Sequence, residues 1–563
     1  MSSSDAHSPP GAQPAGYPGD YTAHVDTFAR DNLPLAAHWP VMRFERPEVR
    51  YPERINCGAV LIDEAVEEGH GGRIALIVDS RSWTYAQLLA DVNRIANALV
   101  RDLSVVPGNR VLLRGPNCPM LFASWLAVMK VGAIAVTTMP LLRAKELGQI
   151  AVKAQIDHAL CDARLLQEVS LTTAQMGRLS RTLTWGDGSL EGLMASHAPT
   201  FNNVETARDD VCLLAFTSGT TGDPKATMHF HRDVLVMADV VGRHLLETTS
   251  DDIYIGSPPL GFTFGLGAQL VFPLRFRGAV ALVEQPSPEN LLTAVEKHRA
   301  TALFTAPTMY RALSTMVKDY DLRSIRRCVS AGEALPKATS DAWHAATGIR
   351  LIDGIGATEM IHMFIASKGD EIRAGATGKT LPGYEAVVLD EQNRVLPRGS
   401  SGRLAVRGPT GCRYLADERQ KSYVIDGWNV TGDQYRVDED GYFWFESRSD
   451  DMIISSGYNI AGPEVEAALI AHPAVLEAAV IGAPDEDRGQ VVKAFIVLRA
   501  GCTPGPILQR ELQDFVKHTV APYKYPRILE FVTALPKTST GKIQRFVLRQ
   551  QESDCTAKVR VPD

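Results

Sequence analysis

The chain has 563 residues, of which 45% are hydrophobic and 22% are charged, and its formal net charge is −7. This length exceeds what one hydrophobic core organises, so we expect about two to four structural units in a globular enzyme. The acidic balance provides no basic surface for DNA or RNA, which excludes nucleic acid as an expected partner.

The cysteines and the N-terminus indicate a cytoplasmic protein. The eight cysteines form no CxxC pair and show no metal-ligand spacing, which is typical of reduced structural thiols. Residues 1–20 lack the basic and apolar regions of a signal peptide and are rich in Ser, Pro, Gly and Ala, so we expect a disordered tail. The apolar stretch 121–142 is interrupted by Lys130, Gly132 and Pro140, so we expect no membrane span.

Short apolar strands alternate with helices in the first part of the chain. The predicted elements are a helix near 60–68, a strand at 74–78, a turn at 81–85, a helix near 86–100, a strand at 110–113, a helix near 120–130 and a strand at 134–136. This alternation predicts βαβ units on a largely parallel sheet, and therefore an α/β fold of doubly wound layers.

Residues 211–225, which read VCLLAFTSGTTGDPK, are the most informative stretch. The first six are nearly all apolar, which predicts a strand buried on both faces. The loop after it offers two glycines, four hydroxyls and one lysine, a combination that can enclose a phosphate. It is not the P-loop of NTPases, because Asp223 and Pro224 separate the second glycine from the lysine. The predicted phosphate contacts are Thr217, Ser218, Gly219, Thr220, Thr221, Gly222 and Lys225.

Further motifs follow this loop. We expect residues 229–231 to open a helix, and the segment GFTFGLG at 261–267 to be a glycine-rich passage with an aromatic wall. The segments VSAGEAL at 329–335 and LIDGIGATE at 351–359 each come at the end of a predicted strand. Near the C-terminus, strands around 478–481 and 493–498 and a helix from Pro463 predict a small α+β unit.

The loop TSGTTGDPK resembles the phosphate-binding loop of the adenylate-forming superfamily, which comprises acyl-CoA synthetases, adenylation domains of peptide synthetases and luciferases. The segments VSAGEAL, DGIGATE, TGD at 431–433, SRSDD at 447–451 and PKTSTGK at 536–542 resemble other motifs of this superfamily, in the same order. The resemblance covers the chain from about residue 23 to residue 549. On these motifs the chain is identified as a member.

The resemblance implies a role for each matching residue. Thr358 would contact the α-phosphate, Glu359 would hold Mg²⁺ beside the phosphates, and Asp433 would accept hydrogen bonds from the ribose. Ile355 stands where many relatives have tyrosine, so the adenine would rest on an aliphatic face. The remaining nucleotide contacts implied are Gly332, Glu333, Ala334, Asp353, Gly354, Gly356, Arg448 and Lys542.

The resemblance also implies a division into two domains. Asp450 would be the hinge between an N-terminal domain of residues 21–449, which binds ATP and the acid, and a mobile C-terminal domain of residues 450–563. Lys542 would be the catalytic lysine, assisted by Glu359 and Thr217. We expect a monomer or a homodimer.

Several stretches are most similar to benzoate- and 2-aminobenzoate-CoA ligases, namely DGIGATEMIH, GFTFGLG, YPERINC and MPLLRAKEL. The implied reaction joins an aromatic carboxylate to coenzyme A through an acyl-adenylate, with ATP consumed, and 2-aminobenzoate is placed ahead of benzoate. The predicted acid pocket comprises Thr263, Phe264, Gly265, Ile355 and His362. A medium-chain fatty acyl-CoA ligase and an enzyme that loads a carrier protein stay open as alternatives. A non-enzymatic nucleotide-binding regulator is disfavoured because Glu359 and Lys542 are both intact.

Overall fold

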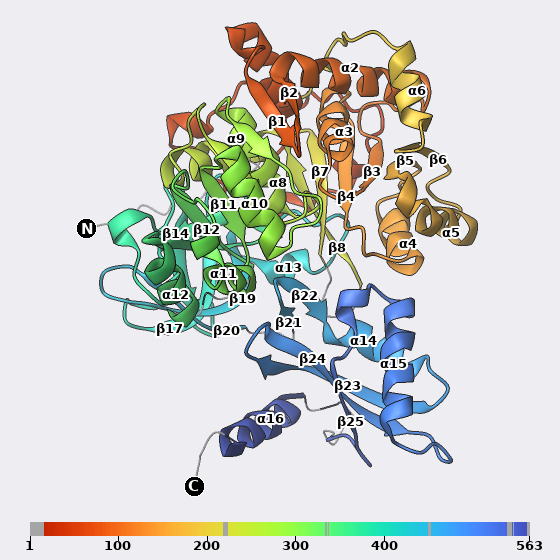
Figure 1. Cartoon of the computed structure of the whole chain (residues 1–563), viewed down its shortest axis with the longest axis vertical. Helices are drawn as coiled ribbons and strands as arrows, with labels where there is room; N and C mark the ends of the chain where they lie inside the picture. Colours follow the sequence, from red (N-terminus) through yellow and green to blue (C-terminus); the bar gives the residue numbers. More distant parts are fainter. Residues whose placement is uncertain are drawn as a thin grey trace.

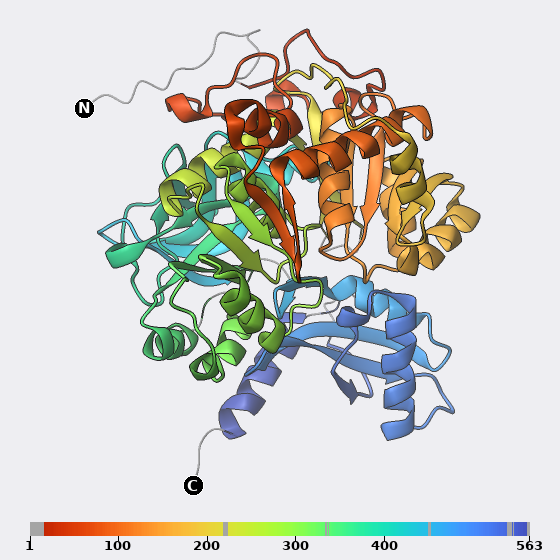
Figure 2. The same cartoon turned by 45° about the horizontal axis from the view of Figure 1, so that its top comes forward.

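A computed structural model describes residues 16–217, 223–332, 335, 337–448, 452–536, 543 and 545–559. It has a large N-terminal part and a small C-terminal part. The small part is the one drawn in blue in Figures 1 and 2. This agrees with the α/β fold expected from the sequence. The predicted boundary at Asp450 and most of the predicted tail lie outside the described residues, so both stay predictions.

One sheet of the large part carries the strand before the predicted phosphate loop. Its strand order is β6 (Arg181–Trp185), β5 (His158–Asp162), β3 (Arg110–Arg114), β4 (Ile134–Thr138), β7 (Val211–Thr217) and β8 (Lys225–Phe230). All neighbours pair in parallel except β7 and β8, which form an antiparallel hairpin. Residues 211–215 of β7 are buried, as a strand covered on both faces requires.

A second sheet carries the strands that end in the other nucleotide motifs. Its order is β15 (Lys379–Thr380), β14 (Met363–Ala366), β13 (Leu351–Gly356), β12 (Arg327–Ser330), β11 (Ala302–Thr305), β9 (Ile253–Gly256), β10 (Ala279–Ala281), β1 (Ile74–Val78) and β2 (Arg81–Thr84). The central strands from β13 to β1 are parallel, and the outer pairs are antiparallel. The ends of β12 and β13 therefore lie side by side at one edge.

Two antiparallel-rich sheets complete the fold. The third sheet contains β16 (Glu385–Leu389), β17 (Ser401–Arg407), β18 (Val424–Ile425), β19 (Trp428–Val437) and β20 (Phe443–Arg448). The sheet of the small part contains β21 (Met452–Ser455), β22 (Tyr458–Ala461), β23 (Val475–Asp485), β24 (Gly489–Leu498) and β25 (Ile528–Phe531). The predicted strands and helix of the C-terminal unit are confirmed.

The helices of the large part cover its sheets (Figure 1). They are α1 (Phe28–Asp31), α2 (Tyr85–Arg101), α3 (Pro119–Lys130), α4 (Ala144–Lys153), α5 (Leu166–Met176), α6 (Ser189–Ser196), α7 (His231–Met237), α8 (Thr263–Leu266), α9 (Phe272–Arg275), α10 (Pro288–His298), α11 (Pro307–Ser314), α12 (Lys337–Thr347) and α13 (Gln420–Tyr423). Those of the small part are α14 (Gly462–Ile470), α15 (Pro506–Thr519) and α16 (Arg545–Val559). Over the described residues, none of these is both long and apolar enough to cross a lipid bilayer.

Three local predictions were wrong, each because tertiary contacts decided the structure. Residues 81–84 are strand β2 and not a turn, since they pair with β1. Residues 225–230, placed in a loop and a helix start, form strand β8, and the helix begins at His231. Residues 263–266 are helix α8, although the three glycines in GFTFGLG predicted a loop.

The two parts meet through a buried charge cluster. Lys524 Nζ lies 2.7 Å from Glu146 Oε1 on α4 and 2.8 Å from Glu464 Oε1 on α14. Lys524 and Glu146 are 4% and 5% exposed, so water screens this pair little. The cluster therefore fixes helix α4 of the large part against the small part.

Candidate active site

The β7–β8 hairpin brings the two ends of the predicted phosphate loop together. Thr217 is the last residue of β7 and is paired with Lys225, the first residue of β8. The buried Oγ1 of Thr217 has no hydrogen-bond partner within the described residues. An unsatisfied hydroxyl beside a lysine fits a phosphate oxygen. Residues 218–222 of the loop lie outside the described residues.

Lys225 contacts Glu359, the carboxylate that the family resemblance predicts to hold Mg²⁺. Its Nζ lies 3.4 Å from Glu359 Oε1 and 3.0 Å from the hydroxyl of Tyr414. The Tyr414 hydroxyl in turn donates a short hydrogen bond to the same Oε1. Glu359 is 7% exposed and Tyr414 is 1% exposed, so these contacts form in a water-poor setting. The structure thus brings Thr217, Lys225 and Glu359 together.

Glu359 is held as a carboxylate. Burial raises its pKa, but the charge of Lys225 and the hydrogen bond from Tyr414 outweigh burial, and the net pKa is lowered. Both contacts use Oε1. A buried carboxylate beside the ends of a phosphate loop fits Mg²⁺, which favours carboxylates together with phosphate oxygens.

A histidine that sequence analysis did not select fixes the backbone of the next motif. His229 Nε2 is 2.8 Å from the carbonyl oxygen of Thr358, and burial lowers the pKa of His229 to about 4. A neutral ring in this position donates Nε2–H to that carbonyl. His229 thereby ties strand β8 to the turn that carries Thr358 and Glu359.

The ends of β12 and β13 supply the predicted adenine side. Ser330 pairs with Asp353 across the two strands, and Gly332 follows with a φ of 96°, which a side chain would strain. Desolvation raises the pKa of Asp353 to about 7. A Cβ built on Gly332 would lie 3.6 Å from the Cα of Gly457 in the small part. The small part therefore reaches this edge of the second sheet.

Asp433, the predicted ribose contact, lies in β19 directly opposite Arg448 in β20. In the sequence the two residues belong to separate motifs. The antiparallel pairing of β19 and β20 makes them neighbours. Only the backbone of Arg448 is described, so the predicted contact of its side chain stays untested.

An aromatic wall surrounds His362. Its ring centroid lies 4.8 Å from that of Phe272, edge to face, and 5.8 Å from that of Phe264. A Cβ on Gly267 would lie 2.7 Å from Cδ2 of His362, so a glycine is needed beside the ring. Burial lowers the pKa of His362 to about 3, and neither ring nitrogen has a well-formed hydrogen bond within the described part of the chain. The imidazole is therefore neutral and able to accept a hydrogen bond.

The comparison with known proteins decides the family. Residues 62–414 match the AMP-binding enzyme family, and residues 464–542 match the AMP-binding enzyme C-terminal domain. The chain belongs to the AMP-binding enzyme family. This confirms the resemblance to adenylate-forming enzymes.

Three relatives illustrate the similarity of this AMP-binding enzyme to known proteins. It is 36% identical to benzoate–CoA ligase of Thauera aromatica over an alignment of 516 residues, with 89% of this chain and 97% of the relative covered. It is 35% identical over 562 residues to the mitochondrial acyl-coenzyme A synthetase ACSM4 of Mus musculus, with 94% and 95% covered. The crystal structure of the anthranilate CoA ligase AuaEII in complex with anthranoyl-AMP is 35% identical, with a TM-score of 0.70 and with 90% of this chain and 99% of that chain covered.

The other residues predicted for the acid pocket of this AMP-binding enzyme have different neighbours. Thr263 and Gly265 lie on α8 with Phe264, and a Cβ on Gly265 would lie only 2.0 Å from the carbonyl oxygen of Pro259. Ile355 packs on the hydrophobic cluster that contains Phe364, whereas Phe264 packs on the main cluster of the large part. The structure joins Phe264 with His362, and a pocket role for Thr263, Gly265 and Ile355 remains a prediction.

Several predicted residues fall outside the described part of the AMP-binding enzyme. They are Ser218, Gly219, Thr220, Thr221, Gly222, Glu333, Ala334, Asp450 and Lys542. Tyr414 and His229 were missed by sequence analysis, because each is an isolated residue whose role depends on strand pairing far along the chain. The structure places Tyr414 beside the hairpin through an isolated β-bridge to Thr227 of β8, which could not be predicted from the sequence.

Proposed function

We propose that the protein is an ATP-dependent aryl-CoA ligase that converts an aromatic carboxylate, 2-aminobenzoate ahead of benzoate, to its CoA thioester. In the first half-reaction a carboxylate oxygen attacks the α-phosphorus of ATP and pyrophosphate leaves. In the second half-reaction the CoA thiolate attacks the acyl carbon and AMP leaves. Mg²⁺, when bound, neutralises phosphate charge.

The proposal of an aromatic acid rests on one observation, namely that the neutral ring of His362 lies against the aromatic rings of Phe264 and Phe272. Phe264 and Phe272 both contact the ring of His362, so an aromatic acid bound there would pack against aromatic side chains, and a pocket for a planar apolar group needs few polar atoms. The amino group of 2-aminobenzoate would donate to a ring nitrogen of His362, which is buried and without a well-formed partner within the described residues. His362 also lies three residues after Glu359, so the acid and the phosphates would meet along one short segment.

The chain's own residues supply the electrostatics of the first step. Carboxylate and phosphate repel each other, and the reaction needs preorganised positive charge and hydrogen-bond donors. Lys225 and Thr217 stand at the two ends of the phosphate loop, and the Tyr414 hydroxyl and the Lys225 ammonium hold Glu359 in place. Lys542 would bridge the carboxylate and the α-phosphate.

Similarity to relatives supports the proposal and defines its main alternative. Benzoate–CoA ligase and anthranilate CoA ligase are named for aromatic acids, and both are about as similar to this chain as ACSM4. An aliphatic acyl-CoA ligase is therefore the second candidate. An enzyme that loads a carrier protein would share the first half-reaction and differ in the acceptor.

A pyrophosphate-release assay over aromatic and aliphatic carboxylates, run with and without CoA and followed by mass spectrometry, separates these candidates. We expect the highest kcat/KM with 2-aminobenzoate and benzoate, and acyl-CoA as the product. A clear preference for octanoate would establish the aliphatic alternative. Pyrophosphate release that CoA does not accelerate, with no thioester formed, would indicate a carrier-protein acceptor.

A further inference from the structure

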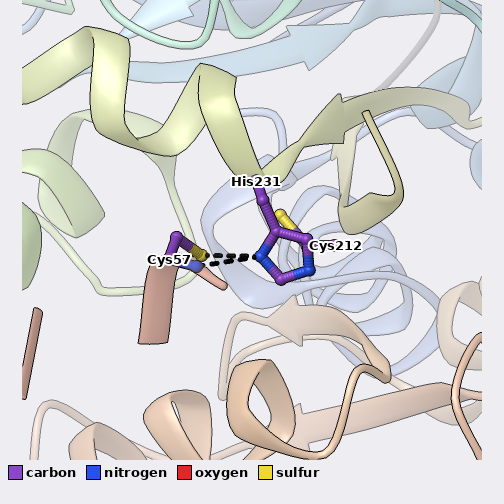
Figure 3. A group of neighbouring side chains, drawn as sticks. All are labelled: Cys57, Cys212 and His231. Atoms are coloured by element: carbon purple, nitrogen blue, oxygen red, sulfur yellow. Dashed lines mark hydrogen bonds between the residues drawn. The ribbon is translucent and has the colours of Figure 1, made fainter. Parts of the chain in front are cut away.

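Two thiols and an imidazole meet in the core of the large part, away from the residues assigned to the nucleotide. The three residues come from different elements (Figure 3). Cys57 lies at the start of the helical stretch just before η3 (Ala59–Asp63), Cys212 lies in β7, and His231 is the first residue of α7. Each is 0% exposed. One ligand atom from each lies within 4.8 Å of those of the other two. Over the residues that the structure describes, no other three metal-binding side chains meet in this way.

The imidazole edge faces Cys57. His231 Nδ1 lies 3.2 Å from Cys57 Sγ and accepts a hydrogen bond from the Cys57 backbone N–H at 3.1 Å. The other ring nitrogen, Nε2, is buried and has no partner within the described residues. Because Nδ1 accepts the hydrogen bond from the Cys57 backbone, Nε2 carries the proton of the neutral ring, and Nδ1 is the nitrogen whose lone pair is directed towards Cys57.

We propose that Cys57, Cys212 and His231 form a binding site for one soft or borderline d¹⁰ cation, Zn²⁺ or Cu⁺. Sulfur and imidazole nitrogen are the donors that these ions favour, whereas Mg²⁺ and Ca²⁺ require oxygen donors. Zn²⁺ with two thiolates, or Cu⁺ with one thiolate and one thiol, leaves the buried cluster without net charge.

The spacing of the donors is close to what such an ion needs. Metal–sulfur bonds of about 2.3 Å and metal–nitrogen bonds of about 2.0 Å place the donor atoms roughly 3.5–4 Å apart. The cluster spans from 3.2 Å between Cys57 Sγ and His231 Nδ1 to an upper bound of 4.8 Å. Small side-chain rotations suffice, and the ion replaces the hydrogen bond that Nδ1 accepts from Cys57. Binding releases the proton of each thiol that becomes a thiolate.

The ion would lie at the base of the β7–β8 hairpin. Cys212 is the second residue of β7, and His231 directly follows β8, while Thr217 and Lys225 lie at the opposite end. Cys57 adds a connection to a third segment. A bound ion would therefore join three separate segments and stabilise the native state by mass action.

Metal binding by the intact, reduced protein provides the first test. After treatment with a chelator and a phosphine reductant, the full chain is titrated with Zn²⁺, with Cu⁺ and, as a negative control, with Mg²⁺. We expect one equivalent of Zn²⁺ or Cu⁺ to bind and to raise Tm by about 3 °C or more. X-ray absorption at the metal edge should show two sulfur neighbours and at least one nitrogen neighbour. A spectrum with oxygen and nitrogen neighbours alone would overturn the proposal, since it would place the ion at carboxylates or at surface histidines.

Variants identify the ligands. Cys57→Ala and Cys212→Ala should each lower the affinity at least 100-fold and abolish the rise in Tm. The matched control is Cys161→Ala, because Cys161 is a buried free cysteine of β5 in a different hydrophobic cluster. It should bind like the unmodified chain. Equal binding by all three variants would refute the site. Circular dichroism checks folding, and if both ligand variants fail to fold, the X-ray absorption spectrum of the unmodified chain decides.

Discussion

Lys225 Nζ lies 3.4 Å from Glu359 Oε1, and the hydroxyl of Tyr414 contacts both groups. These residues come from β8, from the turn after β13 and from the segment before α13. The carboxylate that is predicted to hold Mg²⁺ is thus contacted by two neighbours, which orient it. Tyr414 acts through Glu359 and Lys225, which makes it a positioning residue.

Tyr414→Phe should lower kcat/KM for ATP about tenfold or more in the pyrophosphate-release assay, because a hydrogen bond to a charged group contributes roughly 1.5–3 kcal/mol. The variant should also need more Mg²⁺ for half-maximal rate. Tyr85→Phe is the matched control, since Tyr85 is equally buried and its hydroxyl donates to the carbonyl of Gly278. An unchanged Mg²⁺ requirement in Tyr414→Phe would contradict the positioning role.

The affinity for ATP should depend on pH through Asp353. Desolvation raises the pKa of this carboxyl from 3.8 to about 7, so the ionised form, the better acceptor for the adenine amino group, becomes populated as pH rises through 7. We expect KM for ATP to fall about fivefold between pH 6 and pH 8, and the dependence to disappear in Asp353→Asn. A persistent dependence in the variant would assign it to another group.

The raised pKa of Asp353 also affects the stability of the fold. A rising pH, which should improve ATP binding, should lower this stability. The folded chain keeps the Asp353 proton up to about pH 7, whereas the unfolded chain loses it near pH 4. Between these values the unfolded state binds fewer protons, so this group lowers the free energy of unfolding as pH rises. In Asp353→Asn that contribution is absent, and the difference in Tm between variant and unmodified chain should grow from pH 4 to pH 7.

The acid preference should depend on a hydrogen-bond acceptor at position 362. His362→Leu should reduce the preference for 2-aminobenzoate over benzoate about tenfold, because the amino group would be buried without a partner. His362→Gln, which keeps an acceptor, should retain more of the preference. Comparing kcat/KM for the two acids in both variants measures this, and an identical ratio in all three proteins would exclude His362 from the amino-group contact.

Lys542 lies outside the described residues, and its role is tested by separating the half-reactions. Lys542→Ala should slow pyrophosphate release about 10²–10³-fold, the usual loss when one charge-stabilising group is removed from a site. Conversion of supplied acyl-adenylate and CoA to the thioester should stay near its normal rate. Equal losses in both half-reactions would show that the lysine serves another purpose.

Asp450 is predicted to be the pivot of a rotation that replaces one half-reaction geometry by the other. Proline fixes φ and restricts the residue before it, so Asp450→Pro should hinder rotation. We expect adenylate formation to be largely retained and thioester formation to be slowed, measured by rapid mixing of each step. A variant that slows only adenylation would argue against the hinge.

The strands that carry the nucleotide motifs were predictable, because a buried apolar run followed by glycines and hydroxyls is a local pattern. Thr217 and Lys225 could therefore be selected from their neighbours along the chain, whereas Glu359 was selected from the resemblance of its segment to a family motif. The hydrogen bonds of Tyr414 and His229 could not, since they arise from contacts 55 and 129 residues apart along the chain. The same holds for Cys57, Cys212 and His231, whose spacing in the sequence shows no metal-binding pattern.

Helix α8 shows a second reason for error. Glycines in GFTFGLG suggest a loop, yet Gly265 and Gly267 are needed for close approach to the Pro259 carbonyl and to His362. A glycine that provides room for a neighbour and a glycine that provides backbone freedom look alike in a sequence. Only the fold distinguishes the two uses.

Lys524 is shared by Glu146 of the large part and Glu464 of its own domain. The predicted rotation would carry Lys524 and Glu464 away together, so Glu146 alone would lose its counter-charge and become hydrated. At 0.1 M salt, dissolved ions screen exposed charges that are more than about 10 Å apart, but they screen a buried ion pair much less. They would therefore interact with Glu146 only after the rotation has exposed it. Higher ionic strength would then favour the rotated form without changing how the substrates bind. Glu146, which is not among the residues predicted to contact the nucleotide, would thereby influence the rate of the rotation and of turnover.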